Sequence, residues 1–314
     1  MLQPAQVKRV AVLGAGTIGA SWAAWFLSRG LQVTVWDPDP AAEDHVRRFI
    51  ANAWPTLQRL GMTADASPDA WRFVPAPQDA VRGAAFVQEN APERMEIKQA
   101  LFAQIEPALP PDAILASSSS GLIMSEMQAG LRAAPRMAIG HPFNPPHLIP
   151  LVEVVAGKDT APATVDWCLA FYRQIGKQPI HIRKEAAGHL ANRLQAALFR
   201  AAVRGGARGL ARVEDVDTAI TAGPGLRWAI FGPHMTFHLG GGEGGMPHML
   251  RQFGPAFATW WSTMTTPALT DAVCKQIIDG VMAEAHGRGI ADLARERDAK
   301  LVALLELTGN PAPR

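Results

Sequence analysis

The feature that most constrains this chain is a glycine-rich turn placed between two apolar segments. Residues 8–13 read as a buried strand and run directly into Gly14-Ala15-Gly16-Thr17-Ile18-Gly19. An amphipathic stretch from Ser21 to Leu27 predicts a helix, and a second apolar segment, Val33–Trp36, ends at Asp37. Strand, glycine turn, helix, second strand and terminal carboxylate together predict a βαβ unit that binds a dinucleotide.

Each glycine of the turn meets a separate physical need. Gly14 allows the tight turn, Gly16 lets the backbone approach a pyrophosphate, and Gly19 lets the helix pack closely on the strand. The free N–H groups at the helix N-terminus then face the phosphates. Asp37 is expected to bind the ribose hydroxyls of adenosine and to repel a 2′-phosphate, so the chain is predicted to bind NAD in preference to NADP.

The composition is that of a globular protein without the charge pattern of a polymer-binding one. Of 314 residues, 48% are hydrophobic and 18% charged, and 30 basic side chains nearly balance 28 acidic ones. The sequence has no long basic run and no apolar stretch of about eighteen residues, so neither nucleic acid nor a membrane is an expected partner. Cys168 and Cys274 stand alone in apolar surroundings and are expected to be reduced, as in a cytoplasmic protein.

The first 185 residues alternate short apolar runs with helical stretches, which predicts a parallel sheet covered by helices. The expected strands are 10–13, 33–36, 85–88, 113–116, 137–139, 151–155 and 179–182. From Ala186 onward the pattern is helical, and the clearest expected helices are 190–203, 213–222 and 270–285. We therefore expect an α/β fold in which a Rossmann-type NAD-binding domain, residues 1–185, precedes an all-helical domain for substrate binding and dimerisation, residues 186–314.

Polar residues follow the expected strands at the edge of the sheet where ligands bind. The glycine turn follows the first strand, and Asp37 ends the second. The next three strands are followed by Glu89–Glu93, Ser117–Ser120 and His141. The carboxyl ends of parallel strands share one edge of a sheet, and ligands of open α/β sheets bind there. These residues are therefore expected to form one site.

His141 and Glu153 form the expected catalytic pair. His141 lies in Gly140–Pro146, where three prolines exclude a helix and predict an ordered loop. Glu153 lies within the apolar segment Leu151–Val155, and a buried carboxylate needs a cation or a strong donor. With Glu153 on one ring nitrogen, His141 would remove a hydroxyl proton while a hydride passes to the nicotinamide. The alternatives are a core histidine bonded to a backbone carbonyl and, for Ser117–Ser120, a polar loop without a role.

Two further patterns are interpreted as structural. His234 and His238 have the i, i+4 spacing of zinc ligands but no evident acidic third ligand, so no metal is expected. The glycines of 240–245 lack a preceding strand and a following Lys-Ser/Thr pair. They are therefore expected to form a flexible connection between helices and not a phosphate-binding loop.

Over almost its full length the chain resembles the 3-hydroxyacyl-CoA dehydrogenase superfamily. The matching elements are the glycine turn, Glu89-Asn90-Ala91-Pro92-Glu93 with Lys98, Ser117–Ser120, His141-Pro142-Phe143-Asn144-Pro145, Leu151–Val155 and Gly188-His189-Leu190-Ala191-Asn192-Arg193. The resemblance implies that His141 and Glu153 are the catalytic pair and that Ser120 and Asn192 bind the substrate oxygens. It also implies that the residues helping to hold the nicotinamide half of NAD are Glu93, Lys98 and Asn144.

Departures from the family pattern concern the substrate more than the reaction. The chain has Ser118 and His189 where the acyl-CoA enzymes carry asparagine and phenylalanine. Its loop at 223–233 is longer than theirs and contains an Arg-Trp pair. This loop looks like that of the superfamily branch that oxidises small hydroxy acids such as carnitine and gulonate, and the segments 240–246 and 251–256 favour carnitine.

The expected substrate is therefore a small 3-hydroxy acid, L-carnitine, oxidised to 3-dehydrocarnitine. Arg227 would clamp its carboxylate, and aromatic faces would surround its quaternary ammonium, which donates no hydrogen bond. The candidate aromatic residues, each of which would otherwise be helix-packing core, are Trp228, Phe231, Phe237, Trp260 and Trp261. L-Gulonate and an L-3-hydroxyacyl-CoA thioester are alternative substrates, and a non-catalytic, crystallin-like NAD-binding protein is the alternative from another functional class.

The helical region also predicts self-association. Its apolar faces, such as Ile277 and Ile278 with Val281 and Met282, exceed what one subunit is expected to cover. The family resemblance implies dimers, so a two-fold symmetric homodimer is expected.

Overall fold

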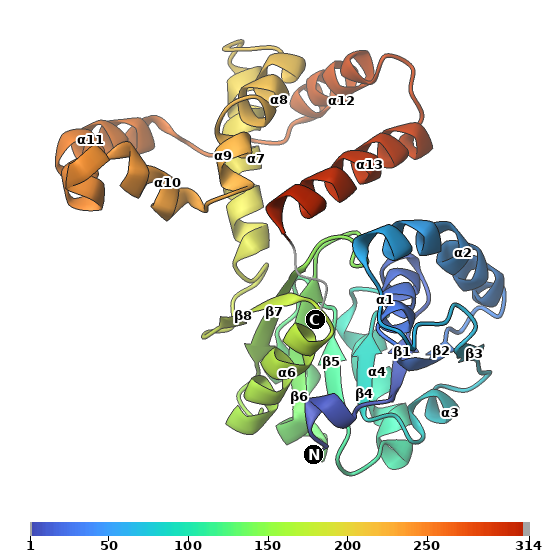
Figure 1. Ribbon diagram of the computed structural model, residues 1–314. Coiled ribbons are helices and arrows are strands. Elements are labelled where there is room, and N and C mark those ends of the chain that lie inside the picture. Colours follow the sequence, from blue (N-terminus) through green and yellow to red (C-terminus); the bar gives the residue numbers. More distant parts are fainter. Residues whose placement is uncertain (1, 310–314) are drawn as a thin grey trace. The chain divides into compact units, whose positions relative to one another are not determined.

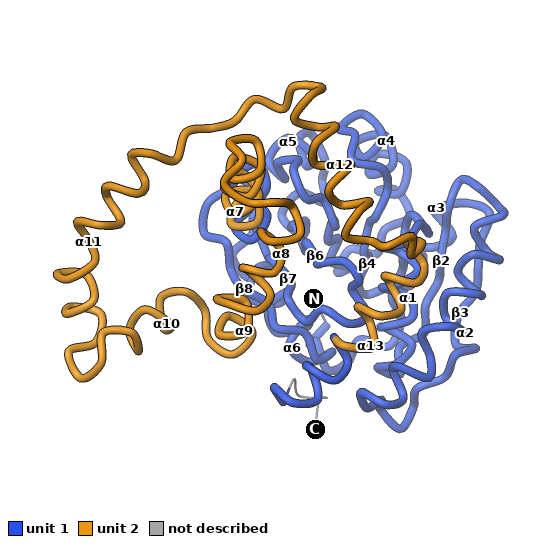
Figure 2. Tube along the Cα trace, turned by 90° about the horizontal axis from the view of Figure 1, so that it is seen from above, with its two compact units in different colours: residues 1–192, 301–314 blue, residues 193–300 orange. Residues whose placement is uncertain are grey.

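The computed structural model describes residues 2–309 and divides into two compact units. Unit 1 comprises residues 1–192 and 301–314, and unit 2 comprises residues 193–300 (Figure 2). The domain boundary expected after residue 185 lies shortly before this division, beyond the last strand. The α/β class, with a Rossmann domain followed by a helical one, is confirmed.

Within the described residues, eight strands of unit 1 form one sheet in the order β3-β2-β1-β4-β5-β6-β7-β8 (Figure 1). The strands are β1 (Arg9–Leu13), β2 (Gln32–Trp36), β3 (Trp71–Phe73), β4 (Phe86–Glu89), β5 (Ile114–Ser117), β6 (Met137–Pro142), β7 (Leu151–Ala156) and β8 (Gln178–Ile182). Neighbouring strands run parallel except β6 and β7, which are antiparallel. The order reverses direction between β1 and β4, which is the position where open sheets of this kind bind ligands.

Helices cover both faces of the sheet. Those of unit 1 are α1 (Thr17–Ser28), α2 (Ala42–Leu60), α3 (Pro77–Val81), α4 (Met95–Ile105), α5 (Met124–Met127) and α6 (Pro162–Gln174), with 3-10 turns at Pro4–Gln6, Glu106–Ala108 and Ala134–Arg136. Residues of α1, α2 and α6 form one apolar cluster, and residues of α3, α4 and α5 form the other. The sheet therefore has a core on each side, as a parallel sheet buried on both faces requires.

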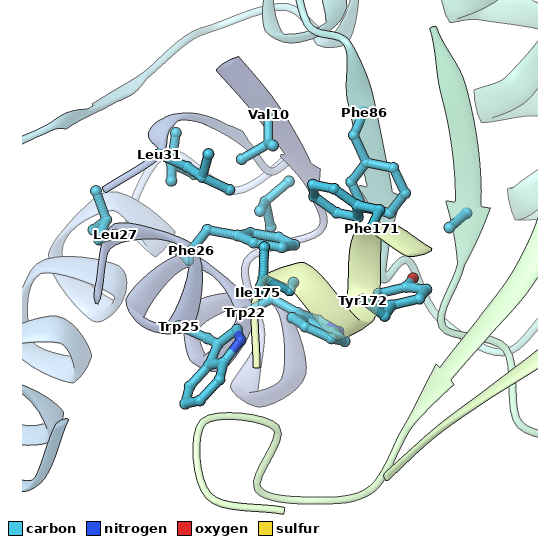
Figure 3. Packing of buried hydrophobic residues seen from close by; sticks show 14 of the residues in the cluster. Val10, Trp22, Trp25, Phe26, Leu27, Leu31, Phe86, Phe171, Tyr172 and Ile175 are labelled. Atoms are coloured by element: carbon cyan, nitrogen blue, oxygen red, sulfur yellow. The ribbon is translucent and has the colours of Figure 1, made fainter. Parts of the chain in front are cut away.

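The alternation of side chains along β1 shows how the two cores arise. Val10 and Val12 belong to the first cluster, whereas Ala11 and Leu13 belong to the second, because successive side chains of a strand point to opposite faces. Aromatic rings fill the first cluster, where the ring centroids of Phe86 on β4 and Phe171 on α6 lie 4.5 Å apart (Figure 3). The aromatic residues of this cluster are Trp22, Trp25, Phe26, Phe86, Trp167, Phe171 and Tyr172.

Unit 2 is helical, as expected. Its helices are α7 (Ala191–Ala207), α8 (Val213–Thr221), α9 (Pro224–Trp228), α10 (Pro233–Gly240), α11 (Gly245–Thr263), α12 (Asp271–Ala285) and α13 (Ile290–Thr308), with a 3-10 turn at Gly242–Gly244; α7 and α13 cross the division between the units. Both views show α10 and α11 side by side, apart from α7, α8 and α12 (Figures 1 and 2). Within residues 2–309 we find no helix with the length and apolar character that a membrane span needs.

The structure corrects the expected character of α1. Its residues from Gly19 to Ser28 are all buried, so the helix is not amphipathic. The polar residues in it are satisfied internally: the hydroxyl of Ser28 donates to the carbonyl of Trp25, and that of Ser21 hydrogen-bonds His147. A helix enclosed by a sheet on one side and by other helices on the rest has no solvent face, and its sequence then shows no strong periodicity.

Two other corrections concern the sheet. The segment at Gly140–Pro146 is not wholly a loop, because β6 continues through Pro142 and pairs with β7. Its prolines exclude a helix, but Pro142 still pairs with Val152 as the last residue of β6. The short strand β3 was not expected from the sequence, and the antiparallel direction of β7 was not expected either.

Candidate active site

The glycine turn between β1 and α1 has the shape required to receive a pyrophosphate. Gly14 has a φ of +85°, and a Cβ there would lie 2.7 Å from the carbonyl carbon of Asn90. A Cβ on Gly19 would lie 1.8 Å from the carbonyl oxygen of Gly14, so only glycine allows α1 to approach so closely. A Cβ on Gly16, by contrast, would meet no described atom within 4 Å. The backbone at Gly16 therefore borders open space, as NAD binding requires.

Asp37 closes the same turn from the end of β2. Its carboxylate accepts the N–H of Ala15 at 2.7 Å and the N–H of Asp39 at 3.0 Å. These bonds place a negative charge beside the N-terminus of α1, where ribose hydroxyls of a bound dinucleotide would donate to it. The residues of the turn and Asp37 thus fit NAD.

The buried carboxylate of Glu153 lies against His141. The two residues are paired across β6 and β7, and His141 Nδ1 lies 2.9 Å from Glu153 Oε2. The other oxygen, Oε1, accepts the N–H groups of Leu190 and Ala191, each at 2.9 Å, at the start of α7. The side chain of Glu153 has no exposed surface, so the partner that a buried carboxylate needs is present.

These contacts keep Glu153 ionised. Burial raises its pKa, but the hydrogen bond from His141 and those from Ala191 and Leu190 outweigh burial and hold the pKa below its ordinary value. Because a carboxylate only accepts, His141 carries its proton on Nδ1 and its Nε2 is the ring atom able to take a proton. This is the orientation of an imidazole that acts as a general base.

A second buried ion pair joins α4 to the end of β4. Lys98 Nζ donates to Glu89 Oε1 at 2.7 Å and to the carbonyl of Ala91 at 3.0 Å, and both ionic side chains are almost fully buried. Ser117 donates to the other oxygen of Glu89 at 2.5 Å. Lys98 Nζ also lies 3.8 Å from Glu93. Since Lys98 is 1% exposed, its predicted role toward NAD would be exerted through the residues that it positions.

Glu93 organises the serine segment that follows β5. Its Oε1 accepts the hydroxyl of Ser119 at 2.7 Å and the N–H groups of Ser120 at 2.9 Å and Gly121 at 2.7 Å. Burial raises the pKa of Glu93, but the Ser119 hydroxyl, the Gly121 N–H and the Lys98 charge together hold it below its ordinary value. Ser117–Ser120 is thus an ordered segment and not a featureless polar loop. Ser120, the expected substrate ligand, begins the turn that Glu93 holds.

Two residues near His141 were not singled out from the sequence. Gln88 on β4 donates to the carbonyl of Gly140 at 3.1 Å and to the hydroxyl of Ser118 at 2.8 Å. The hydroxyl of Tyr172 on α6 donates in turn to Gln88 at 2.7 Å, and burial raises the pKa of Tyr172 so that it stays neutral. The sequence signal available for Gln88 was a polar residue within a buried strand. Its partner Tyr172, 84 positions away, could not be deduced from the sequence.

The other predicted site residues belong to different segments of the chain. Asn144 is exposed just after β6, and Asn192 is the second residue of α7, next to Ala191. Arg227 and Trp228 lie on α9 in unit 2, where both are exposed, and Phe231 follows three residues later. These assignments stay predictions.

The remaining aromatic candidates gather on α10 and α11. Phe237, Trp260 and Trp261 surround Phe257, with ring centroids 5.3, 5.3 and 5.8 Å from it. No ring contact joins Trp228 or Phe231 to this group among residues 2–309. Packing of ring on ring is the structural role that these residues were expected to have if they did not bind a ligand.

The metal and thiol candidates have plain surroundings. Among residues 2–309, no group of three or more His, Cys, Asp or Glu side chains could hold a metal ion. His238 accepts the N–H of Met246 at 3.1 Å. Neither cysteine forms a disulfide, and burial raises the pKa of the Cys168 thiol to about 12, so it is unreactive.

Comparison with known proteins supports the cofactor and the reaction. The chain matches the NAD-binding domain of 3-hydroxyacyl-CoA dehydrogenase over residues 9–186 and the C-terminal domain of 3-hydroxyacyl-CoA dehydrogenase over residues 188–286. It is 48% identical to an L-carnitine dehydrogenase of Streptomyces coelicolor over 313 residues, which cover 100% of this chain and 98% of that protein. It is 44% identical to an L-carnitine dehydrogenase of a Pseudomonas species, over 96% of this chain and 94% of that protein.

A solved structure is similar over the whole chain. It is a 5-formyl-3-hydroxy-2-methylpyridine 4-carboxylic acid 5-dehydrogenase, described as an NAD-dependent dismutase, with a TM-score of 0.84 and 30% identity over 98% of this chain and 100% of that one. The 3-hydroxybutyryl-CoA dehydrogenase of Escherichia coli gives a TM-score of 0.63 and 30% identity over 74% of this chain and 49% of that one.

The fold and site together define an NAD-dependent dehydrogenase that acts on a CH–OH group. The glycine turn, Asp37 and the polar edge of the sheet supply the features of such an enzyme. More particularly, the chain belongs to the 3-hydroxyacyl-CoA dehydrogenase family.

Proposed function

We propose that this enzyme oxidises the 3-hydroxyl of L-carnitine to the ketone, giving 3-dehydrocarnitine, with His141 as the general base. The observation that carries the proposal is the 2.9 Å contact between His141 Nδ1 and the buried carboxylate of Glu153. The identity to L-carnitine dehydrogenases over the full chain supports the choice of substrate.

The residues divide the chemistry between them. NAD, when bound, accepts a hydride at C4 of its nicotinamide. His141 takes the hydroxyl proton on Nε2 while the C3–H bond breaks, and Glu153 stabilises the imidazolium that forms. Ser120 and Asn192 hydrogen-bond the reacting oxygen. Because the proton moves to a base held in one tautomer and orientation, the reacting groups need no rearrangement during the step.

The two ends of the substrate require different partners. We assign the carboxylate to Arg227, which is exposed on α9. Trp228 and Phe231 are 38% and 48% exposed, so their faces are available to a quaternary ammonium. The cofactor side is assigned to the glycine turn and Asp37, with Glu93, Lys98 and Asn144 toward the nicotinamide.

The test is NADH formation at alkaline pH with four substrates side by side: L-carnitine, D-carnitine, L-gulonate and L-3-hydroxybutyryl-CoA. We expect kcat/KM for L-carnitine to exceed that for each of the others by about 100-fold or more, since charged groups at both ends and one hand of the alcohol must fit. Turnover of the thioester alone would refute the substrate proposal and keep the dehydrogenase chemistry. Equal turnover of D-carnitine would contradict a fixed orientation at His141.

We also propose that the enzyme is a cytoplasmic homodimer. Unit 2 exposes apolar side chains on α12, where Ile278, Val281 and Met282 are 60%, 48% and 63% exposed, and on α11, where Trp261 is 67% exposed. Soluble monomers rarely expose large contiguous apolar patches, so we assign the exposed apolar face of α12 to the dimer interface. Sedimentation equilibrium is expected to give twice the 33.7 kDa chain mass, and a monomer at micromolar concentration would contradict the proposal. The cytoplasmic location stays a prediction.

A further inference from the structure

His189 is a buried histidine beside the proposed catalytic pair to which the mechanism above gives no task. Its side chain is 3% exposed, and its ring centroid lies 5.3 Å from that of His141. Its Nε2 lies 2.9 Å from the carbonyl oxygen of Ser119. A carbonyl only accepts, so Nε2 carries the proton and donates it to Ser119.

That hydrogen bond fixes one particular peptide group. The carbonyl of Ser119 and the N–H of Ser120 belong to the same peptide plane, and the N–H donates to Glu93 at 2.9 Å. His189 therefore holds one side of this plane while Glu93 holds the other. A peptide group held on both sides cannot rotate. The direction in which the Ser120 side chain projects from the backbone is therefore fixed as well.

The surroundings of His189 are costly for a residue that only fills space. Its backbone φ is +46°, in the left-handed region that only a few per cent of non-glycine residues adopt, although histidine enters it more readily than most. Its Nδ1 is buried and has no hydrogen-bond partner among residues 2–309. An apolar ring of similar size would avoid the unsatisfied nitrogen. Costs of both kinds persist where a specific contact requires them, and they are concentrated at functional sites.

His189 also connects the two halves of the proposed site. Leu190 and Ala191, the next two residues, give their N–H groups to Glu153, which holds His141. The same short segment thus contacts Glu153 through its backbone and Ser119 through the His189 ring. A displacement of the segment would move the base and the serine relative to each other.

We propose that His189 is a positioning residue, which sets the orientation of Ser120 relative to His141 through the Nε2–H bond to the Ser119 carbonyl. This inference rests on the proposed function, because the task of Ser120 toward the reacting oxygen is part of that function. His189 itself need not touch the substrate. Its contribution is to the geometry of the transition state, so it should appear in kcat more than in the KM for NAD.

Three substitutions separate the hydrogen bond from the volume of the ring. His189→Phe keeps the ring and removes the donor, and we expect kcat to fall by about 10- to 100-fold, the usual cost of a misplaced reacting group. Glutamine places its amide nitrogen near the position of Nε2, so His189→Gln is expected to restore most of kcat. Asparagine places its amide nitrogen near Nδ1, too short to reach Ser119, so His189→Asn should stay as slow as His189→Phe. The KM for NAD is expected to change by less than about threefold in all three.

A double-mutant cycle with Ser120→Ala shows whether His189 acts through Ser120. If it does, His189→Phe adds little to the loss already caused by Ser120→Ala. Fully additive losses, or equal activity of the Gln and Asn variants with both folded by thermal unfolding, would overturn the inference. Wild-type kcat in Ser120→Ala would instead refute the role of Ser120 in the proposed function, so the two failures are distinguishable.

Discussion

Replacing Glu153 with glutamine is expected to lower kcat by about 10³- to 10⁴-fold with the protein still folded, as when an amide replaces the acid of a catalytic triad. The two backbone N–H groups of Leu190 and Ala191 require an acceptor, so the amide oxygen of the new side chain will face them. Its NH₂ group then faces His141 Nδ1. The imidazole must accept there and carry its proton on Nε2, which leaves no lone pair for the substrate hydroxyl.

The measurement is steady-state kcat together with the dissociation constant for NAD, which should change by less than about threefold because the glycine turn is unaltered. His141→Ala provides the reference for a site without a base. Glu43→Gln is the matched control, because it makes the same chemical change in an exposed glutamate of α2 that pairs with Arg47. A loss in Glu153→Gln smaller than about tenfold would contradict the tautomer mechanism.

The pH dependence follows from the lowered pKa of Glu153. Its folded-state pKa lies below the unfolded value, about 4.3 for glutamate. The group therefore contributes stability that is present above the unfolded pKa and is lost as the pH falls through the folded one. At the neutral and alkaline pH of a dehydrogenase assay Glu153 stays ionised. Any acid limb in the activity profile above about pH 5 must then come from a group other than Glu153.

The cofactor half of the site was predictable because its constraints are local. The three glycines and Asp37 lie within 24 residues of sequence, and each is required by the geometry of one turn. The contact between His141 and Glu153 was also predictable, for a different reason. A carboxylate inside an apolar strand must find a donor, and strands that neighbour in sequence often neighbour in space.

What the sequence could not show depends on contacts between distant segments. The connection between β6 and β7 has eight residues, which is too short for the crossover that a parallel pair needs, so β7 runs antiparallel to β6. The sequence did not show where β6 ends, and the length of this connection was therefore unknown. β3 has three residues and no pattern of its own. The tasks of Gln88 and His189 come from partners 52 and 70 positions away, which composition and periodicity do not reveal.

Asp37→Asn is expected to reduce the preference for NAD over NADP by about 10- to 100-fold. In the wild-type protein the 2′-phosphate of NADP would meet the carboxylate of Asp37, and a pair of like charges in close contact costs several kcal/mol, or more than about 100-fold in kcat/KM. The asparagine side chain keeps an oxygen that accepts the N–H of Ala15, now bonded at 2.7 Å, so the turn should hold its shape. The variant thus removes the charge and keeps the hydrogen bond from Ala15, while the second bond, which the other carboxylate oxygen accepts from the N–H of Asp39, is lost.

The ratio of kcat/KM for NAD to that for NADP is the quantity to measure. We expect this ratio to fall for two reasons. The amide binds the ribose hydroxyls of NAD less strongly than a carboxylate does, and it repels the 2′-phosphate of NADP less. Asp39→Asn is the control, because it removes one negative charge two residues away from Asp37. Asp39 accepts the N–H of Ala41, and the amide oxygen of asparagine can still do so. If the ratio falls equally in Asp39→Asn, discrimination comes from the general negative charge of this segment; if it falls only in Asp37→Asn, it comes from the carboxylate that closes the glycine turn.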